Sequence, residues 1–411
     1  MKKLLVLSVF LLTGLMVLSA SGKLEIFSWW TAGGEEDALF ALYDVFHENY
    51  PDVEIINATV AGGAGTNAKA VLKTRMIGGN PPDSFQVHAG AEMNDTYVVT
   101  GLMEPITPFF KEWGIMDKFP KDILDICSYE GEVYSVPVNI HRGNVMFYSK
   151  EIIEDVGIET LPTTWPEFID TLKEIENAGY IPLALGDKNK WTAAHLFESV
   201  LLGILGPYQY NGLWDGRVSF ENEGVKKALE VFRELMNYVN EDHSALAWQD
   251  ATRLLYEKQA AFNVMGDWAE GYLKTLGWKP EENFGWMALP STRGSFMIVS
   301  DTFGLPKNAP NRSNAIRWLK VISSVEGQDA FNPIKGSIPA RIDANPELYD
   351  VYLRWSMEDF KTNALCPSIA HGSAAPEAFT TALNDIINRF IATGNVDEAW
   401  NSIIEAAEEN L

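Results

Sequence analysis

The chain has 411 residues, with 32 Lys or Arg, 56 Asp or Glu and 13 Trp, so its formal net charge is −24. This length predicts about two or three domains, and a composition that is 46% hydrophobic and 21% charged is typical of a soluble globular protein. The acidity argues against a nucleic-acid partner, which requires a basic surface, and the presence of only 2 Cys excludes a disulfide scaffold.

The first residues have the pattern of an export signal. Two lysines precede an apolar run over residues 4–18 and the small residues 19–22, which predicts a signal peptide over residues 1–22. The run is shorter than the roughly 20 residues that a membrane-spanning helix needs. No Cys follows it until Cys127, so we expect no lipid anchor and a mature chain that is free in a periplasm. Cys127 and Cys366 can pair there or remain two buried thiols.

Strands and helices alternate at the start of the mature chain. This order predicts an α/β domain with a mainly parallel sheet. The expected strands are residues 24–29, 53–56 and 85–88, and the expected helices are 39–50, which Pro51 stops, and 71–76.

The rest of the chain continues to alternate, with more helix. Residues 133–138 are rich in β-formers but contain Pro137, which places them at a sheet edge. Pro166 sits just inside the start of a helix. Further helices are expected over 224–239, 315–321 and 378–411, and further strands over 296–299 and 303–306.

Several segments occur in a familiar order. The chain resembles the extracellular solute-binding proteins of sugar ABC transporters, family 1, the group that includes maltose-binding protein, over essentially its whole mature length. The segments that carry this resemblance are 27–30, 50–53, 79–83, 131–137, 261–268 and 332–337. Residues 27–30, 85–90, 137–142 and 369–372 are most similar to the glucose-type binding proteins of thermophilic bacteria.

The resemblance implies the α/β periplasmic binding protein fold, in which two α/β lobes are joined by a multi-crossing hinge and the ligand lies in the cleft between them. We expect lobe 1 to comprise 23–137 plus 289–337, and lobe 2 to comprise 138–288 plus 338–411. Such proteins are not enzymes: they close on a sugar by hinge motion and deliver it to the permease subunits of an ABC transporter. The expected ligand is glucose, with trehalose or sucrose possible, and we expect no cofactor, no metal and a monomer.

A pyranose has two faces of C–H groups and a rim of hydroxyls, so its site needs flat aromatic walls and charged hydrogen-bonding groups. Four tryptophans are candidates for the walls, although each has a core position as its alternative. They are Trp29 and Trp30, where a strand meets a glycine turn, and Trp248 and Trp268, at expected helix starts. Trp191 is a weaker candidate.

The polar candidates are Glu35, Gln86, His88, Asp301, Lys335 and His371. Gln86 and His88 share one face of an otherwise apolar strand. Glu35 lies at the start of a helix, where a carboxylate is also an ordinary favourable charge. The resemblance places Asp301, Lys335 and His371 at ligand-contacting positions. Of these, Lys335 is expected in a Pro/Gly loop. His141 can simply line the hinge.

Two other classes of function stay open. An exported glycoside hydrolase would need two carboxylates about 5–10 Å apart, but no catalytic or phosphate-binding motif is present, and residues 62–65 indicate only a turn. A polyamine-binding protein would suit the acidity. Lys335 and His88 argue against a cationic ligand, and no Cys/His cluster indicates zinc.

Overall fold

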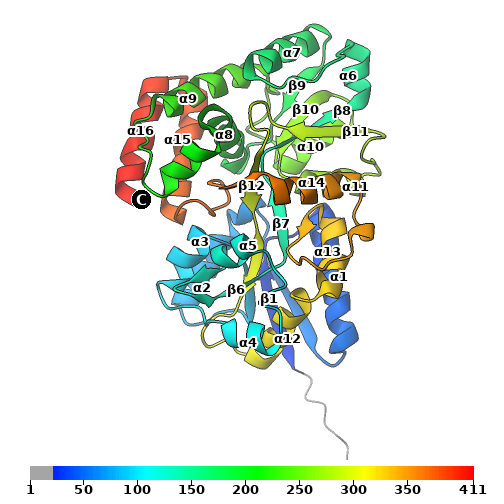
Figure 1. Ribbon diagram of the computed structural model, residues 1–411, viewed down its shortest axis with the longest axis vertical. Coiled ribbons are helices and arrows are strands. Elements are labelled where there is room, and N and C mark those ends of the chain that lie inside the picture. The colour runs from blue at the N-terminus through cyan, green and yellow to red at the C-terminus, as the bar shows by residue number, and fades with distance from the viewer. Residues whose placement is uncertain (1–21) are drawn as a thin grey trace, which may run out of the picture.

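The computed structural model describes residues 22–411, so the expected signal peptide, residues 1–22, lies outside the described residues apart from Gly22. Figure 1 shows two lobes stacked along the long axis of the molecule, with the expected α/β architecture. Within the described part of the chain, no helix is both long and apolar enough to cross a membrane.

The first lobe is built on a five-stranded sheet. Strand β1 is parallel to β2 and β3, but β13 enters from far along the chain and runs antiparallel to β3 and β6. The mainly parallel sheet predicted from the early alternation is therefore confirmed, since β6 runs in the same direction as β1, β2 and β3 and β13 alone is reversed. The predicted edge position of Pro137 is confirmed, because β6 is an outer strand. In spatial order the strands are β2 (Glu54–Thr59), β1 (Lys23–Ser28), β3 (Ser84–His88), β13 (Asp301–Gly304) and β6 (Ser135–Pro137).

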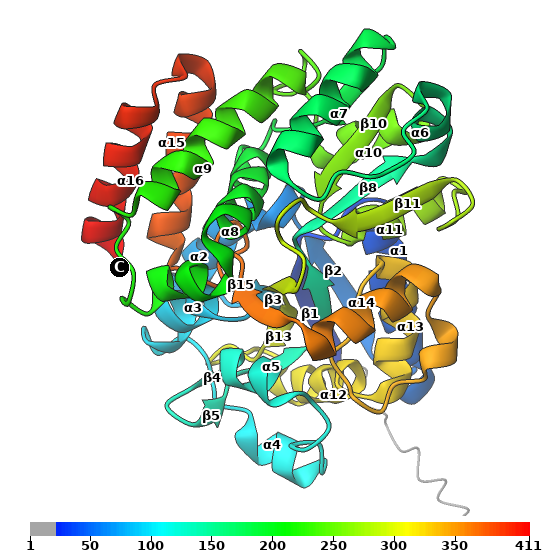
Figure 2. The same ribbon diagram turned by 45° about the horizontal axis from the view of Figure 1, so that its top comes forward.

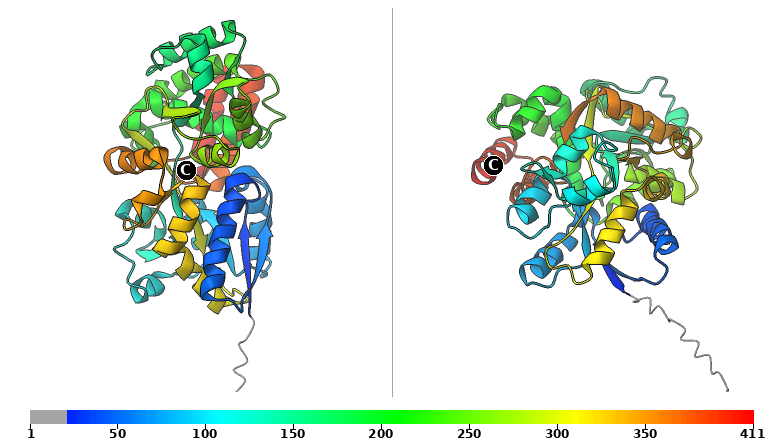
Figure 3. Two further views of the ribbon diagram at one scale, coloured as in Figure 1. Left: turned by 90° about the vertical axis from the view of Figure 1, so that its right-hand side faces the viewer. Right: turned by 60° about the horizontal axis from the view of Figure 1, so that its bottom comes forward.

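Helices cover this sheet, and α1 and α13 lie side by side against it (Figure 3). Helix α1 buries Leu39, Leu42 and Phe46 and ends before Pro51, as its sequence predicts. The elements of this lobe are α1 (Gly33–Asn49), α2 (Ala68–Ile77), α3 (Ala91–Met93), the π-turn Asn94–Val98, α4 (Thr107–Glu112), α5 (Lys121–Ile126), the hairpin β4 (Ser128–Tyr129) and β5 (Glu132–Val133), α12 (Arg312–Ile322) and α13 (Val325–Lys335).

The second lobe has a four-stranded mixed sheet under a thick helical layer. Figure 2 shows α15 and α16 beside α8 and α9 on its outer side. The strand order is β11 (Phe284–Ala288), β8 (Val145–Ser149), β10 (Ala260–Met265) and β9 (Ile181–Ala184). The helices are α6 (Lys150–Val156), α7 (Trp165–Asn177), α8 (Trp191–Trp214), α9 (Glu223–Leu235), α10 (Trp248–Tyr256), α11 (Trp268–Thr275), α15 (Glu377–Thr393) and α16 (Val396–Asn410).

A third sheet connects the lobes, and its strands β7 and β12 lie between them in Figure 1. Two of the expected lobe boundaries, after residues 137 and 337, fall just before β7 and β14, whereas β12, which was expected in lobe 1, joins this connecting sheet and not the sheet of the first lobe. The predicted lobe boundaries therefore stay a prediction. In order the strands are β14 (Ile338–Pro339), β7 (Asn139–Arg142), β12 (Ser295–Val299) and β15 (Ala364–Pro367), with α14 (Val351–Thr362) packed nearby.

The two cysteines belong to different cores. Cys127 is buried in the cluster that fills the first lobe, and Cys366 in the cluster that fills the second. Both are free thiols, which decides between the two states that the sequence leaves open. Burial raises the pKa of each thiol to about 12.

Candidate ligand-binding cleft

Element ends from both lobes converge on one cavity with about 340 Å³ of empty space. In the first lobe, Trp29 and Trp30 directly follow the end of β1, and β3 ends at His88, so both strands deliver side chains at their carboxyl ends, where α/β sheets bind ligands. Helix starts supply the opposite wall. The lining residues are Trp29, Trp30, Glu35, Ala64, His88, His141, Trp191, Trp248, Trp268, Val299, Asp301, Lys335 and His371.

Nine of the ten candidates from the sequence line this cavity, and Gln86 is the exception. Gln86 is fully buried below the floor. Its Nε2 donates to Oδ1 of Asp301 at 2.8 Å, and its Oε1 accepts from the backbone N–H of Trp29 at 3.1 Å. It therefore ties two lining residues together and does not itself face the cavity.

The aromatic walls belong to the core and to the cavity at once. Trp30 packs on Phe303 and Phe331 in the first lobe while its ring still lines the cavity. In the second lobe, the ring centroids of Trp191 and Trp268 lie 6.1 Å apart. The buried Nε1 atoms of Trp30 and Trp191 have no hydrogen-bond partner among the described residues. Both residues line the cavity, so an acceptor placed against either Nε1 would satisfy that donor.

Asp301 is the best-anchored acid of the cavity. Its Oδ2 accepts from Nδ2 of Asn139 at 2.9 Å, and its backbone N–H donates to Oδ1 of Asn139 at 2.9 Å. Burial opposes ionisation, but the hydrogen bond with His141 and the charge of Lys335 outweigh it and hold the pKa of Asp301 below its usual range. The site therefore presents a fixed anionic acceptor.

His88 lies between the carboxylates of Glu92 and Asp301. Its Nδ1 lies 3.0 Å from Oε2 of Glu92, and Nζ of Lys69 lies 2.7 Å from the same oxygen. Burial raises the pKa of Glu92, but Lys69 and His88 reverse this, so the pKa of Glu92 is lowered overall. The centroid of the His88 ring lies 4.9 Å from that of Trp29, so this ion pair also positions an aromatic wall.

Lys335 is the cation of the cavity. The sequence suggests that it lies in a Pro/Gly loop, but this is wrong: Lys335 is the last residue of α13, which continues through Pro333. Its Nζ lies 2.8 Å from Oε1 of Glu35 and 5.8 Å from the ring centroids of both Trp30 and Trp268. It therefore links both lobes' aromatic walls to an acid.

His141 connects the two lobes. Its Nδ1 hydrogen-bonds to Asp267, which precedes α11, and its Nε2 lies 3.3 Å from Oδ2 of Asp301 in the first lobe. Burial and the charge of Lys335 disfavour protonation, but the two carboxylates outweigh them and raise the pKa of His141. Asp267 makes no side-chain cap on α11 and instead holds His141 and the backbone N–H of Arg142.

The ten sequence candidates leave out four lining residues, Ala64, His141, Trp191 and Val299. Nothing in the local sequence separates His141 and Trp191 from residues of a hinge or a core. Ala64 lies in the Gly63–Gly65 turn, whose sequence indicates only a turn. A Cβ on Gly63 would lie 2.8 Å from Nε1 of Trp191 and 3.1 Å from Cδ1 of Trp248. This turn of the first lobe therefore packs directly on the second-lobe wall.

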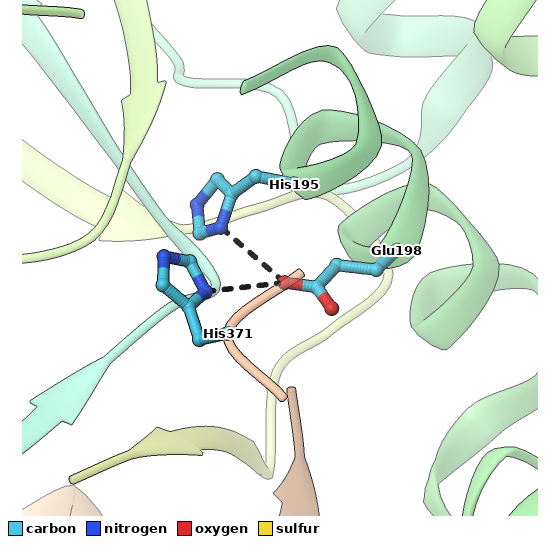
Figure 4. Close-up of side chains that lie close together, drawn as sticks. All are labelled: His195, Glu198 and His371. Carbon is cyan, nitrogen blue, oxygen red and sulfur yellow. Dashed lines mark ion pairs between the residues drawn. The ribbon is translucent and has the colours of Figure 1, made fainter. Parts of the chain in front are cut away.

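Beside the cavity, His195, Glu198 and His371 form a buried cluster (Figure 4). Their ligating atoms all lie within 4.8 Å of one another, and two imidazoles with a carboxylate are a donor set that zinc uses. Oε1 of Glu198 lies 3.3 Å from Nδ1 of His195 and 4.0 Å from Nδ1 of His371. The sequence missed this cluster because His371, in the loop joining β15 to α15, lies 173 positions after Glu198 on α8.

The amino-acid sequence matches one family of known proteins over most of its length. The model of the bacterial extracellular solute-binding proteins matches residues 21–329. An ABC transporter extracellular-binding protein of Pyrococcus horikoshii is 41% identical, covering 95% of this chain and 88% of the relative. A probable sugar-binding periplasmic protein of Mesorhizobium japonicum is 32% identical, covering 94% of each chain.

The fold has a counterpart among solved structures. A chitin oligosaccharide binding protein superimposes with a TM-score of 0.83 at 19% identity, covering 94% of this chain and 98% of that one. At this identity the likeness shows the fold alone. Members of the matched family bind solutes and are not enzymes, which removes the hydrolase alternative. The chain belongs to the bacterial extracellular solute-binding protein family.

Proposed function

We propose that the protein is the periplasmic sugar-binding component of an ABC importer, which binds glucose or a small glucose-containing sugar in the cleft. The observation that carries this proposal is the make-up of the cavity. Tryptophans from both lobes supply flat apolar surfaces, and carboxylate, ammonium and imidazole groups lie among them. A pyranose offers C–H faces to the former and hydroxyls to the latter.

The balance of charge in the cavity favours a neutral polyol. Asp301 and Glu35 are acceptors, Lys335 is a donor, and the acid Glu35 is already paired with that lysine. A polyamine would meet Lys335 at close range, so the cation-binding alternative gains no support. A sugar hydroxyl both donates and accepts, and it can therefore satisfy each of these groups.

The cavity is the smaller of two adjoining hollows, which favours a small sugar. Its empty space, open solvent included, is about 340 Å³. A second hollow of about 860 Å³ of empty space adjoins it and shares Ala64 and Trp191 with it. We expect a monosaccharide to occupy the first hollow alone, and a disaccharide such as trehalose or sucrose to extend into the second.

Glucose is the preferred ligand because of the residues that resemble glucose-type proteins, and two more distant relatives are named for monosaccharides. A glucose-binding protein of Saccharolobus solfataricus is 25% identical over 75% of this chain, and a xylose/arabinose-binding protein of Haloferax volcanii is 27% identical over 95%. The signal-like residues 1–22, with no Cys after the apolar run, favour a free periplasmic protein. Its protein partners would be the permease subunits of the transporter.

Calorimetric titration of the chain without residues 1–22 tests the proposal. The panel is glucose, galactose, xylose, trehalose, sucrose and spermidine. We expect saturable one-to-one binding of glucose or of one glucose-containing sugar, with a matching rise in melting temperature because ligand stabilises only the native state. Binding of spermidine alone would overturn the proposal, and so would release of nitrophenol from nitrophenyl glycosides.

A further inference from the structure

Glu198 is a fully buried carboxylate on α8 that does not line the cavity. Its Oε1 accepts from the Ser368 hydroxyl at 2.8 Å, and its Oε2 accepts from the backbone N–H groups of Ile369 at 2.5 Å and Ala370 at 3.0 Å. These donors lie on the loop between β15 and α15, which carries His371 into the cavity. One carboxylate on a helix therefore anchors the loop that presents a lining residue.

The hydrogen bonds at Ser368 fix the position of a proton. A serine hydroxyl has one proton, and the carboxylate of Glu198 acts as an acceptor to the two backbone N–H groups, so Ser368 donates its proton to Glu198. The same Oγ lies 2.9 Å from Nδ1 of His371. Because its only proton is already used, Oγ must accept at this contact. Nδ1 of His371 therefore carries a proton.

The second ring nitrogen of His371 is then bare. A neutral imidazole has a single N–H, and among the described residues no carboxylate oxygen lies within 4.0 Å of Nε2 to hold a second proton there. Figure 4 shows one ring nitrogen turned toward Glu198 and the other turned away. Within residues 22–411, no hydrogen bond engages that second nitrogen, Nε2, although the ring lines the cavity.

We propose that Glu198 is a specificity-determining positioning residue, which acts through Ser368 to present His371 to the ligand with Nε2 as an acceptor. This inference rests on the proposed sugar-binding function. At this point the site requires a group that donates a proton. A free sugar hydroxyl meets the requirement, whereas a glycosidic or ring oxygen, or a fluorine, does not.

The first test is the tautomer of His371 in the ligand-free protein. The chain without residues 1–22 is labelled with ¹⁵N-histidine, and His371→Gln assigns the signals in a long-range ¹H–¹⁵N spectrum. We expect a protonated Nδ1 and an unprotonated Nε2 near neutral pH. A ring protonated at Nε2, or at both nitrogens, would overturn the inference. So would an Nδ1 that lacks a proton until EDTA is added, which would assign the cluster of His195, Glu198 and His371 to a metal.

The chain of hydrogen bonds from His371 through Ser368 to Glu198 is called the relay below. The second test reverses the direction in which its protons are donated. In Glu198→Gln, the amide oxygen can keep the backbone donors of Ile369 and Ala370, and the amide N–H₂ then donates to Ser368. The serine proton must turn to Nδ1 of His371, and the ring proton moves to Nε2. A merely structural role for Glu198 would leave the tautomer unchanged. Ser368→Ala is the second variant: it removes the relay without touching the carboxylate, and we expect a mixture of tautomers.

The readout on the ligand uses glucose and its 2-, 3-, 4- and 6-deoxyfluoro derivatives, because fluorine cannot donate a proton. In the wild type, fluorine at the position facing Nε2 should weaken binding by about tenfold or more relative to glucose. In Glu198→Gln, that penalty should fall to about twofold or less, because Nε2–H now donates. An unchanged penalty in the folded variant would overturn the inference.

The two proposals fail differently. If glucose and every other sugar fail to bind, the sugar-binding proposal is wrong, while the tautomer of His371 still decides the relay. If glucose binds but the ring carries its proton on Nε2, the relay is wrong and the sugar-binding proposal stands.

Discussion

Asp301 concentrates the polar contacts of the cleft, since Gln86, Asn139 and His141 all converge on its carboxylate. Replacement by Ala removes a charged acceptor from the proposed sugar site. We expect Asp301→Ala to weaken glucose binding by about 1.5–3 kcal/mol, the range for hydrogen bonds to charged groups. Calorimetry measures this change, and a thermal melt run alongside confirms that the variant is folded. Unchanged affinity in a folded variant would remove Asp301 from the site.

His141 makes the molecule sensitive to pH. The imidazole of His141 lies between Asp267 and Asp301, and its pKa is raised in the folded protein. As the pH rises, the unfolded chain therefore loses this proton before the folded protein does. The stabilisation is complete below the ordinary histidine pKa of about 6.5 and is lost as the pH climbs through the raised folded value. His141→Gln should therefore cost most free energy of unfolding at and below about pH 6.5, and progressively less above it. Urea unfolding of both proteins at several pH values measures the difference; a pH-independent difference would contradict the assignment.

At the scale of elements, the Gly63–Gly65 turn of the first lobe packs against the tryptophans of the second lobe. A methyl group at Gly63 would lie within 3.1 Å of both Trp191 and Trp248. We expect Gly63→Ala to weaken sugar binding by about 1–3 kcal/mol, because overpacking must displace an indole. The control is Gly78→Ala, at the end of α2, whose φ of −73° suits alanine. Equal affinities for the two variants would show that the turn does not pack on the liganded cleft.

The elements of the fold were largely predictable from local pattern. Strand β1, helix α1 and the proline-led start of α7 follow alternation, helical spacing and the Thr164 capping box, all of which are local signals. Strand β13 was not predicted as antiparallel, because its pairing with β3 joins residues more than 200 positions apart. Lys335 was assigned to a loop because prolines and glycines flank it, yet tertiary packing against α1 keeps the last turn of α13 helical.

The candidate site was predictable only where a residue type carried a signal. Tryptophan at a strand end or helix start, and polar residues within apolar strands, identified most of the cavity lining. Gln86 carried the same signal as His88 but lies one layer deeper. Glu198, His195 and Ala64 gave no signal at all, since their roles arise from contacts between segments far apart in the chain.

For the whole molecule, α11 of the second lobe lies against α1 and α13 of the first. A Cβ on Gly271 would lie 2.4 Å from the carbonyl oxygen of Lys335, and one on Gly34 would lie 3.3 Å from Gly271 itself. Nζ of Lys274 donates to the carbonyl of Pro333 at 2.8 Å in the same interface. Glycines on both sides thus allow backbone to meet backbone where the lobes touch.

This interface predicts a variant that stays open. Gly271→Ala places a methyl group against Lys335, so the lobes should not close fully even with sugar present. Small-angle X-ray scattering should show a smaller radius of gyration on adding glucose to the wild type, and a reduced change in the variant. The sugar-free variant serves as its own control, and a full decrease on adding glucose would show that this contact does not limit closure.

We propose that a sugar binds between tryptophans of the two lobes, and a paired titration checks that claim. Wild type and Trp268→Ala are titrated with glucose in the same calorimeter, and both are checked for folding. We expect saturable one-to-one binding by the wild type, and binding weakened at least about tenfold by loss of a wall that lies against Lys335, His141 and His371. Equal affinity in the two proteins would contradict the claim.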